Sequence, residues 1–307
     1  MHPAVISRLA PTPSGFLHLG NAFNFLLTWL LVDYMDGHLL LRIDDLDAPR
    51  VETAFVEDIF VQLEWLGISY DSGPSGPDEL LSKYSQRLRK EHYFETIELL
   101  RKSGHLYACQ CSRAEIRKLT TTGIYPGTCR RNKYPLENND QAWRVQVPEQ
   151  TLVSYSSFSK KIKTINVTQN MGDFIIKRRD GLPAYQLASL VDDLDAGVTL
   201  VVRGQDLRTS TAAQLYLAKC LNEKKFPASR FVHHNLIKND SGQKLSKSKN
   251  SFSLQMLQKK YRTPTWIYQE TAKRLKLPFH EILILKDLKE VFKIHMDLKP
   301  DFLSVLD

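Results

Sequence analysis

A histidine and a glycine follow a turn near the start of the chain, in a pattern that suits phosphate binding. Residues 6–10 are apolar and predict a strand, and the Pro, Ser and Gly residues of 11–15 end it. His18 and Gly20 then open an apolar stretch that predicts a helix over residues 18–35. Backbone N–H groups at a helix N-terminus bind phosphate, and glycine lets a nucleotide lie against the backbone. Taken alone, however, a histidine beside a glycine is most often an ordinary surface residue.

Two lysines, Lys244 and Lys247, lie in a stretch rich in Ser and Gly. A solvated basic loop is the usual interpretation of such a run. The functional alternative is that these lysines act on a phosphate leaving group, on which negative charge builds as it departs. Mobile ammonium groups stabilise that charge as it develops.

Together the two stretches resemble the HIGH and KMSKS signatures of class I aminoacyl-tRNA synthetases. HLGN (18–21) keeps the first His and the Gly of the first signature, and KLSKS (244–248) differs from the second at one position. The resemblance extends over roughly residues 8–257 and implies ATP as a substrate, Mg²⁺ on its phosphates, and His18, Lys244 and Lys247 as catalytic residues. The ATP site that it implies comprises His18, Gly20, Asn21, Gln205, Asp206, Lys244 and Lys247.

Within this class, the chain is similar to the enzymes that activate glutamate. Their RIEDxD stretch, whose first acidic residue grips the amino group of the amino acid, is RIDDLD (42–47) here, so that Asp44 stands where the family has Glu. Ser189 stands where glutamyl-tRNA synthetases often have Asn. Arginine forks onto a carboxylate, which suits selection of glutamate. The glutamate site that the resemblance implies comprises Arg8, Thr12, Asp44, Tyr185 and Arg203.

Three cysteines lie close together in the sequence: Cys109, Cys111 and Cys129. Buried structural thiols are the common explanation of such a pattern. Three thiolates beside glycine-rich turns also suit tetrahedral zinc, with His92 and His105 as nearby nitrogen donors.

The segments CxCSRAEI and GIYPGTCR resemble the zinc segment of glutamyl-queuosine tRNA(Asp) synthetases, short paralogues of glutamyl-tRNA synthetase. This resemblance implies Zn²⁺ bound by Cys109, Cys111, Tyr125 and Cys129. Because phenolate is an uncommon zinc ligand, His105 remains an alternative to Tyr125.

The composition is that of a globular chain: 307 residues, 42% hydrophobic and 25% charged. A net charge of +8 permits a polyanionic partner without requiring one. We expect no signal peptide and no membrane span, because the most apolar run, 23–32, is too short to cross a bilayer. The few cysteines argue against a disulfide scaffold and for a cytoplasmic protein. We also expect a monomer.

Alternating strand and helix patterns predict an α/β fold with a Rossmann-like parallel sheet. We expect a catalytic domain from residues 1–83 and 187–232, an insertion with the zinc site over 84–186, and a KLSKS loop with a helical stem-contact domain over 233–307. Strands are predicted over 39–43, 143–147, 152–168, 174–177, 198–203 and 231–237. Helices are predicted over 53–66, 84–102, 182–191, 210–221, 267–275, 279–285 and 288–294.

Three functions are compatible with these residues. The first is transfer of activated glutamate to the queuosine base of tRNA(Asp), and the second is charging of tRNA(Glu) by a truncated glutamyl-tRNA synthetase. The third is a non-catalytic tRNA-binding module, which the presence of His18, Gly20 and KLSKS disfavours. The stretch after KLSKS, 249–307, is too short for a helical anticodon-binding domain, and the zinc segment also favours the first function.

Overall fold

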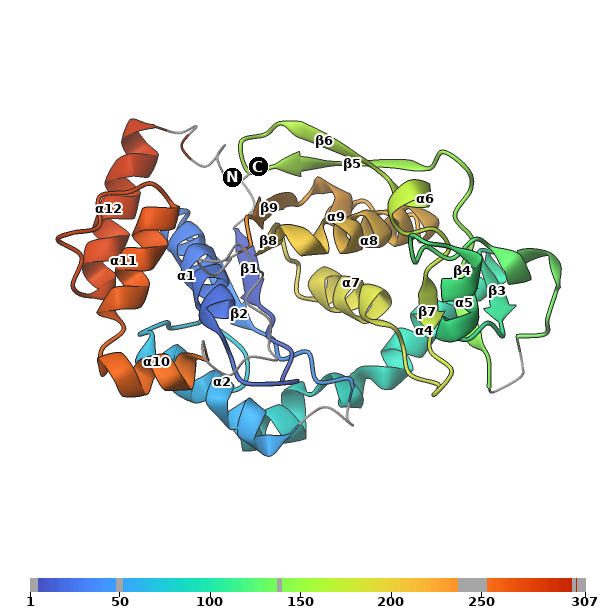
Figure 1. The fold of residues 1–307 in the computed structure, drawn as a ribbon, viewed down its shortest axis with the longest axis horizontal. Coiled ribbons are helices and arrows are strands. Elements are labelled where there is room, and N and C mark those ends of the chain that lie inside the picture. Colours follow the sequence, from blue (N-terminus) through green and yellow to red (C-terminus); the bar gives the residue numbers. More distant parts are fainter. Residues whose placement is uncertain (1–4, 48–51, 137–139, 237–252, 300–301, 303–307) are drawn as a thin grey trace.

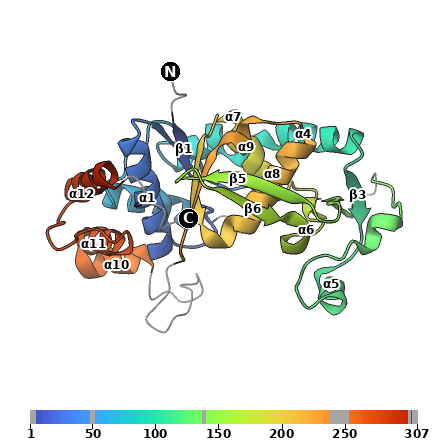
Figure 2. The same cartoon turned by 90° about the horizontal axis from the view of Figure 1, so that it is seen from above.

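The computed structural model describes residues 5–47, 52–136, 140–236, 253–299 and 302. Three regions follow one another along its longest axis (Figure 1). The C-terminal helices form one end, a sheet with flanking helices forms the middle, and a small sheet containing β3, β4 and β7 forms the other end. The view from above gives the same order (Figure 2). In the described part of the chain, no helix combines the length and the apolar character needed to cross a membrane.

The middle region is built on parallel strands, as predicted. β1 pairs in parallel with β2, and β8, β9 and β5 form a second parallel set in which β6 is the antiparallel edge. β1 lies beside β8, because Thr199 N donates to Ile6 O at 2.9 Å and Ser7 Oγ donates to Leu200 O at 2.8 Å. The strands are β1 (Ile6–Leu9), β2 (His38–Leu41), β5 (Leu152–Ser157), β6 (Ile162–Asn166), β8 (Leu200–Gly204) and β9 (Arg230–His234).

Helix α1 (Leu19–Tyr34) is buried over most of its surface, which agrees with its apolar sequence. It ends just before Gly37, where a Cβ atom would lie only 2.6 Å from Val5 O, so glycine is required for the close approach to the N-terminal strand. The other main helices of this region are α2 (Thr53–Trp65), α7 (Tyr185–Asp195) and α8 (Arg208–Cys220). They lie within a few residues of the predicted ranges.

The helix predicted over 84–102 is interrupted. α4 (Lys90–Lys102) begins later, after a short 3-10 helix (Gln86–Arg89). Ser85 Oγ and Gln86 N both donate to the buried carboxylate of Asp45, at 2.6 and 2.8 Å. These long-range bonds fix the backbone at 85–86 outside the helix.

The insertion is a three-stranded antiparallel sheet of β3 (Leu106–Cys109), β4 (Ala142–Val145) and β7 (Ile175–Lys177). α5 (Arg113–Leu119) and a 3-10 helix (Thr128–Arg131) extend from it. β5 and β6 also fall within the range predicted for the insertion, but they belong to the sheet of the middle region: β5 pairs with β9, and β6 pairs with β5. Short helical segments also connect the longer elements: α3 (Pro77–Glu79), a π-helix (Leu80–Tyr84), α6 (Val167–Asn170), a 3-10 helix (Gln205–Leu207) and α9 (Lys225–Ala228).

The C-terminal helices are α10 (Leu254–Tyr261), α11 (Thr265–Arg274) and α12 (Leu285–Leu298). The helix predicted over 279–285 is wrong. Thr265 Oγ1 donates to Leu283 O at 2.7 Å and Gln269 Nε2 donates to Ile282 O at 3.0 Å, so side chains of α11 bind the backbone of this segment, and the next helix begins only at Leu285. α12 covers the prediction at 288–294 and packs Phe292 into the same apolar core as α1.

Candidate active site and candidate metal centre

A cavity of about 670 Å³ opens at the carboxyl ends of β1 and β8, where ligands of open α/β sheets bind. Segments far apart in the sequence meet there: the turn after β1, the start of α1, Asp44 after β2, the start of α7, and the ends of β8 and β9. Its lining residues are Arg8, Ala10, Pro11, Thr12, His18, Gly20, Asn21, Asn24, Phe25, Asp44, Tyr185, Val202, Arg203, Gly204, Asp206, Leu207, His234 and Leu236.

The N-terminus of α1 faces this cavity and is held in place from both sides. His18 N donates to Asn21 Oδ1 at 3.0 Å, and the preceding Leu17 N donates to the carboxylate of Asp58 on α2 at 2.9 Å. A Cβ on Gly20 would lie 2.9 Å from the imidazole Cε1 of His18. Glycine at this position therefore leaves room for the histidine ring beside the N–H groups of the first helical turn, which is where phosphate binds.

Two lining residues of the cavity, Arg8 and Asp44, belong to a buried network of ion pairs. Asp193 Oδ1 accepts from Arg8 Nε at 2.9 Å and from Arg42 Nη1 at 2.5 Å. Burial by itself raises the pKa of Asp193, but the charges of Arg8 and Arg42 outweigh it and lower that pKa. Asp44 Oδ1 accepts from Arg42 Nε at 2.7 Å, and the pKa of Asp44 is raised, mainly by burial. The carboxylate of Asp44 is therefore already bonded within the protein.

Arg203 is a buried charge at the cavity that has no carboxylate partner among the described residues. Its side chain is buried, and Nη1 donates to Gln214 Oε1 at 2.9 Å. Within the described residues, its Nε and Nη2 atoms have no hydrogen-bond partner. Burial, with a smaller contribution from the charge of Arg8, lowers the pKa of Arg203 to about 10. A buried guanidinium with a free edge is suited to a ligand carboxylate.

The structure brings most of the predicted substrate-site residues together in this cavity; of the described ones, Gln205 is not among its lining residues. Lys244 and Lys247 lie outside the described residues. The nearest described residues before and after these lysines are Leu236 and Ser253. Leu236 lines the cavity, and Ser253 forms an antiparallel β-bridge with His18.

Sequence reasoning missed two polar lining residues, Asn24 and His234. His234 Nε2 lies 3.0 Å from Asn24 Oδ1, and burial lowers the pKa of this histidine. Asn24 could have been found from its position one helical turn after Gly20, on the same face of α1. His234 lies within the strand predicted over 231–237 and ends the observed β9, and its place in the cavity depends on which strand lies beside β9.

The second candidate site lies in the insertion, where three thiols converge. The Sγ atoms of Cys109, Cys111 and Cys129 lie within 4.8 Å of one another, and within the described residues no histidine joins this group. The Tyr125 hydroxyl is 3.4 Å from Cys109 Sγ and 3.6 Å from Cys111 Sγ. The geometry favours Tyr125 over His105 as a fourth ligand.

These distances fit a tetrahedral ion. With Zn–S bonds of about 2.3 Å and a Zn–O bond of about 2.0 Å, the edges of a tetrahedron are about 3.8 Å between sulfurs and about 3.5 Å between sulfur and oxygen. Cys111 and Cys129 Sγ are 3.4 Å apart, and the two Tyr125 distances lie close to the expected edge. The donor set therefore fits zinc.

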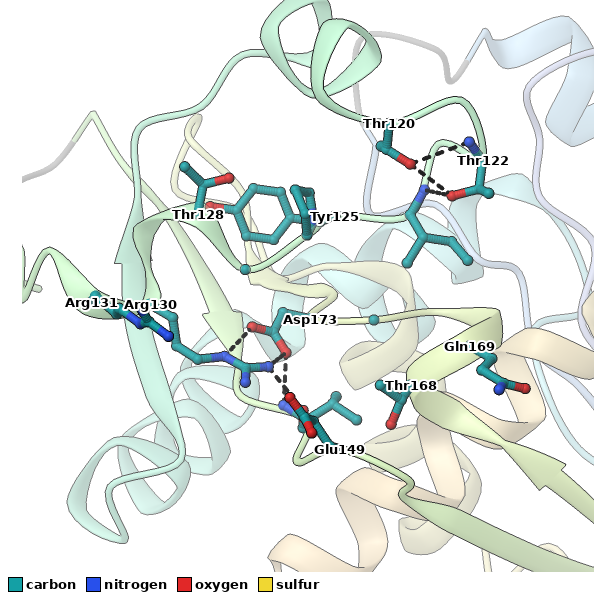
Figure 3. A pocket seen from close by; sticks show the side chains of 15 residues that line it. Thr120, Thr122, Tyr125, Thr128, Arg130, Arg131, Glu149, Thr168, Gln169 and Asp173 are labelled. Carbon is teal, nitrogen blue, oxygen red and sulfur yellow. Dashed lines mark hydrogen bonds and ion pairs between the residues drawn. The ribbon is translucent and has the colours of Figure 1, made fainter.

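A buried charge cluster anchors the same tyrosine. The Arg144 guanidinium carbon lies 3.9 Å from the centroid of the Tyr125 ring, and Arg144 Nη1 donates to Asp173 O at 2.7 Å. The carboxylate of Asp173 accepts from Arg130 and from the Tyr107 hydroxyl, at 2.8 and 2.6 Å. Figure 3 shows Arg130 extending to Asp173 beside a second cavity of about 630 Å³, which Tyr125 also lines.

Comparison with known proteins places the chain in a family. Residues 4–297 match the family model of class I tRNA synthetases (E and Q), catalytic domain. A glutamyl-Q tRNA(Asp) synthetase of Burkholderia cenocepacia is 36% identical over 264 residues, which is 83% of this chain and 84% of that protein. A glutamyl-Q tRNA(Asp) synthetase of Pseudomonas syringae pv. syringae is 39% identical over 252 residues, or 81% of this chain and 79% of that protein.

Solved structures agree on the fold. A glutamate-tRNA synthetase of Elizabethkingia anophelis superposes with a TM-score of 0.72 at 22% identity, covering 94% of this chain and 66% of that chain. The chain thus spans about two thirds of the length of that enzyme. The chain belongs to the class I tRNA synthetases of the glutamate and glutamine type, as a ligase of the glutamyl-Q tRNA(Asp) synthetase group.

Proposed function

We propose that the chain activates glutamate with ATP and transfers it to the queuosine base in the anticodon loop of tRNA(Asp). The observation that carries this proposal is the juxtaposition, in one cavity, of the α1 N-terminus and a buried arginine with a free edge. The first group suits phosphate and the second suits a carboxylate. The substrates of an adenylation reaction would therefore meet in the cavity.

Glutamate would bind at the end of the cavity formed by Arg8, Tyr185 and Arg203. Nε and Nη2 of Arg203 form the side-on edge of the guanidinium, which can take one carboxylate in bidentate fashion. Thr12 and the partly exposed Tyr185 complete this end of the cavity. Because Asp44 is bonded to Arg42, it would reach the substrate amino group through its remaining acceptor positions or through a water molecule.

Adenylation would proceed by in-line attack of a glutamate carboxylate oxygen on the α-phosphorus of ATP, with pyrophosphate leaving. The protein contributes position and charge stabilisation rather than covalent chemistry. His18 and the N–H groups of the first turn of α1 would stabilise the charge at the α-phosphate, and Lys244 and Lys247 that on pyrophosphate. Mg²⁺, when bound with ATP, would neutralise phosphate charge.

The acceptor follows from the relatives, which are named glutamyl-Q tRNA(Asp) synthetases. The net charge of +8 suits a tRNA partner. A base in a single-stranded loop can leave its stack at little cost and enter an active site. Cytoplasmic location and a monomeric state remain predictions.

We also propose a structural zinc ion held by Cys109, Cys111, Tyr125 and Cys129. With these four ligands the coordination shell is closed, so the ion would stabilise the insertion and take no part in chemistry. Its support is the tetrahedral spacing of the four donors.

Pyrophosphate exchange without tRNA tests the activation step. Glutamate should drive the exchange of label between pyrophosphate and ATP, whereas glutamine and aspartate should drive it weakly. Glutamine lacks the side-chain charge, and aspartate is one methylene shorter. Faster exchange with aspartate would instead mean that Asp44 has changed the size of the pocket, and the assignment of glutamate would be rejected.

A further inference from the structure

Three arginines are buried around the active-site cavity, and they differ in how their charge is compensated. Arg8 and Arg42 both donate to Asp193, and Arg42 also bonds Asp44. In the part of the chain that the structure describes, Arg203 forms no ion pair with a carboxylate. Its polar contact is with an uncharged side chain, Gln214 on α8.

Gln214 is fully buried, and its Oε1 accepts from Arg203 Nη1 at 2.9 Å. This bond occupies one end of the guanidinium. Nε and Nη2, which point along the other edge, keep no partner among the described residues. The guanidinium carbon also lies 5.9 Å from the centroid of the Phe231 ring, which supports the planar group from β9. Gln214 therefore selects which edge of Arg203 is left for a ligand.

We propose that Gln214 is a positioning residue for the substrate carboxylate: it holds Arg203 by Nη1 and, being neutral, leaves the charge of Arg203 for the amino acid. The proposal rests on the proposed activation of glutamate and adds a residue that does not itself line the cavity.

The choice of glutamine over glutamate at this position has a physical consequence. A carboxylate at 214 would form a buried, charge-assisted bond with Arg203 and satisfy it within the protein. The substrate carboxylate would then compete with an internal partner for the same cation. A glutamine orients the arginine without compensating its charge, so that the ligand supplies the missing negative charge.

Three variants separate this role from a general effect on folding. Gln214→Glu keeps the shape and adds the competing charge, and Gln214→Met removes the hydrogen bond but keeps the size. Gln141→Met makes the same change at a glutamine that is equally buried but lies in the insertion and does not line the cavity. Each variant is compared with the wild type in glutamate-dependent pyrophosphate exchange, with KM measured separately for glutamate and ATP, and in thermal melting.

Gln214→Glu should raise KM for glutamate by about tenfold or more, because an internal ion pair must be broken to bind substrate. Gln214→Met should raise it by about threefold to tenfold, the usual range for one lost positioning hydrogen bond. KM for ATP should change less than about twofold in both variants, and Gln141→Met should leave both KM values unchanged whatever its melting temperature.

Other results overturn the proposal. If Gln214→Glu keeps the wild-type KM for glutamate, or if both KM values rise by the same factor, Gln214 has only a structural role while the proposed function stands. If the wild-type protein shows no glutamate-dependent exchange, the proposed function fails and this inference fails with it.

Discussion

The most informative single substitution is Tyr125→Phe, because it removes one oxygen atom from the candidate metal centre and leaves the ring in place. The stacking of Arg144 on that ring is retained, since it involves the ring face. What is lost is the fourth donor, 3.4 Å and 3.6 Å from two thiols, and the acceptor of the Cys129 N–H, 2.8 Å away.

The loss of the zinc ligand and the loss of the hydrogen-bond acceptor can be measured separately. Changing even an outer-shell partner of a metal ligand costs about 10- to 100-fold in affinity, so loss of a direct ligand should cost about a hundredfold or more, equivalent to about 2.8 kcal/mol. The unpaired N–H of Cys129 should cost about 1–3 kcal/mol with or without metal. The free energy of unfolding should therefore fall further in the zinc-loaded protein than in the chelated protein.

Competition with a chromogenic zinc chelator measures the first quantity, and urea unfolding with and without chelator measures the second. Tyr134→Phe is the matched control, because Tyr134 packs against the cluster of Cys109, Tyr125 and Cys129 and its hydroxyl accepts from Asn132 Nδ2. It should bind zinc as the wild type does. If Tyr125→Phe keeps the wild-type affinity for zinc while His105→Ala loses it, Tyr125 is not the fourth ligand.

Three further predictions follow from named contacts. His18→Ala should slow glutamate-dependent pyrophosphate exchange by about a hundredfold, the usual effect of losing one group that stabilises the transition state, and should leave the melting temperature unchanged. If exchange slows by less than about threefold, His18 has no part in the mechanism. Asp173→Asn should lower the free energy of unfolding by about 2–3 kcal/mol in urea, because it neutralises the partner of Arg130, and an unchanged midpoint would contradict that assignment. Burial, followed by the charge of Arg203, lowers the pKa of His233 to about 3. Below about pH 6.5 the unfolded chain binds a proton at His233 and the folded chain does not. The free energy of unfolding should therefore fall as the pH decreases from about 6.5 to 3, by up to about 1.4 kcal/mol per pH unit. His233→Gln should remove this contribution when melting is measured as a function of pH.

The parts of the fold that could be predicted are those with local signals. The parallel strands of the middle region follow from short apolar runs between turn residues. The cavity residues Arg8, Thr12 and Asp44 follow from their positions at strand ends, since the carboxyl ends of parallel strands meet at one edge. Their roles in binding glutamate remain predictions.

The parts that could not be predicted depend on contacts between distant residues. The interruption of the helix predicted over 84–102 arises from Asp45, some forty residues earlier, which fixes Ser85. The loop at 276–284 is held by side chains of α11, and periodicity alone does not reveal them. The hydrogen bond between Asp44 and Arg42 could not be predicted either. The carboxylate of Asp44 can bond to the substrate or to the arginine, and the sequence does not say which.

One labelling experiment shows where the protein attaches glutamate. The protein is incubated with ATP, labelled glutamate and either tRNA(Asp) carrying queuosine, the same tRNA as an unmodified transcript, or tRNA(Glu), and the products are cleaved with ribonuclease. We expect label on the anticodon fragment of modified tRNA(Asp) and none on the unmodified transcript. Label on the 3′-terminal fragment of tRNA(Glu) would rule out transfer to queuosine and identify the chain as a glutamyl-tRNA synthetase.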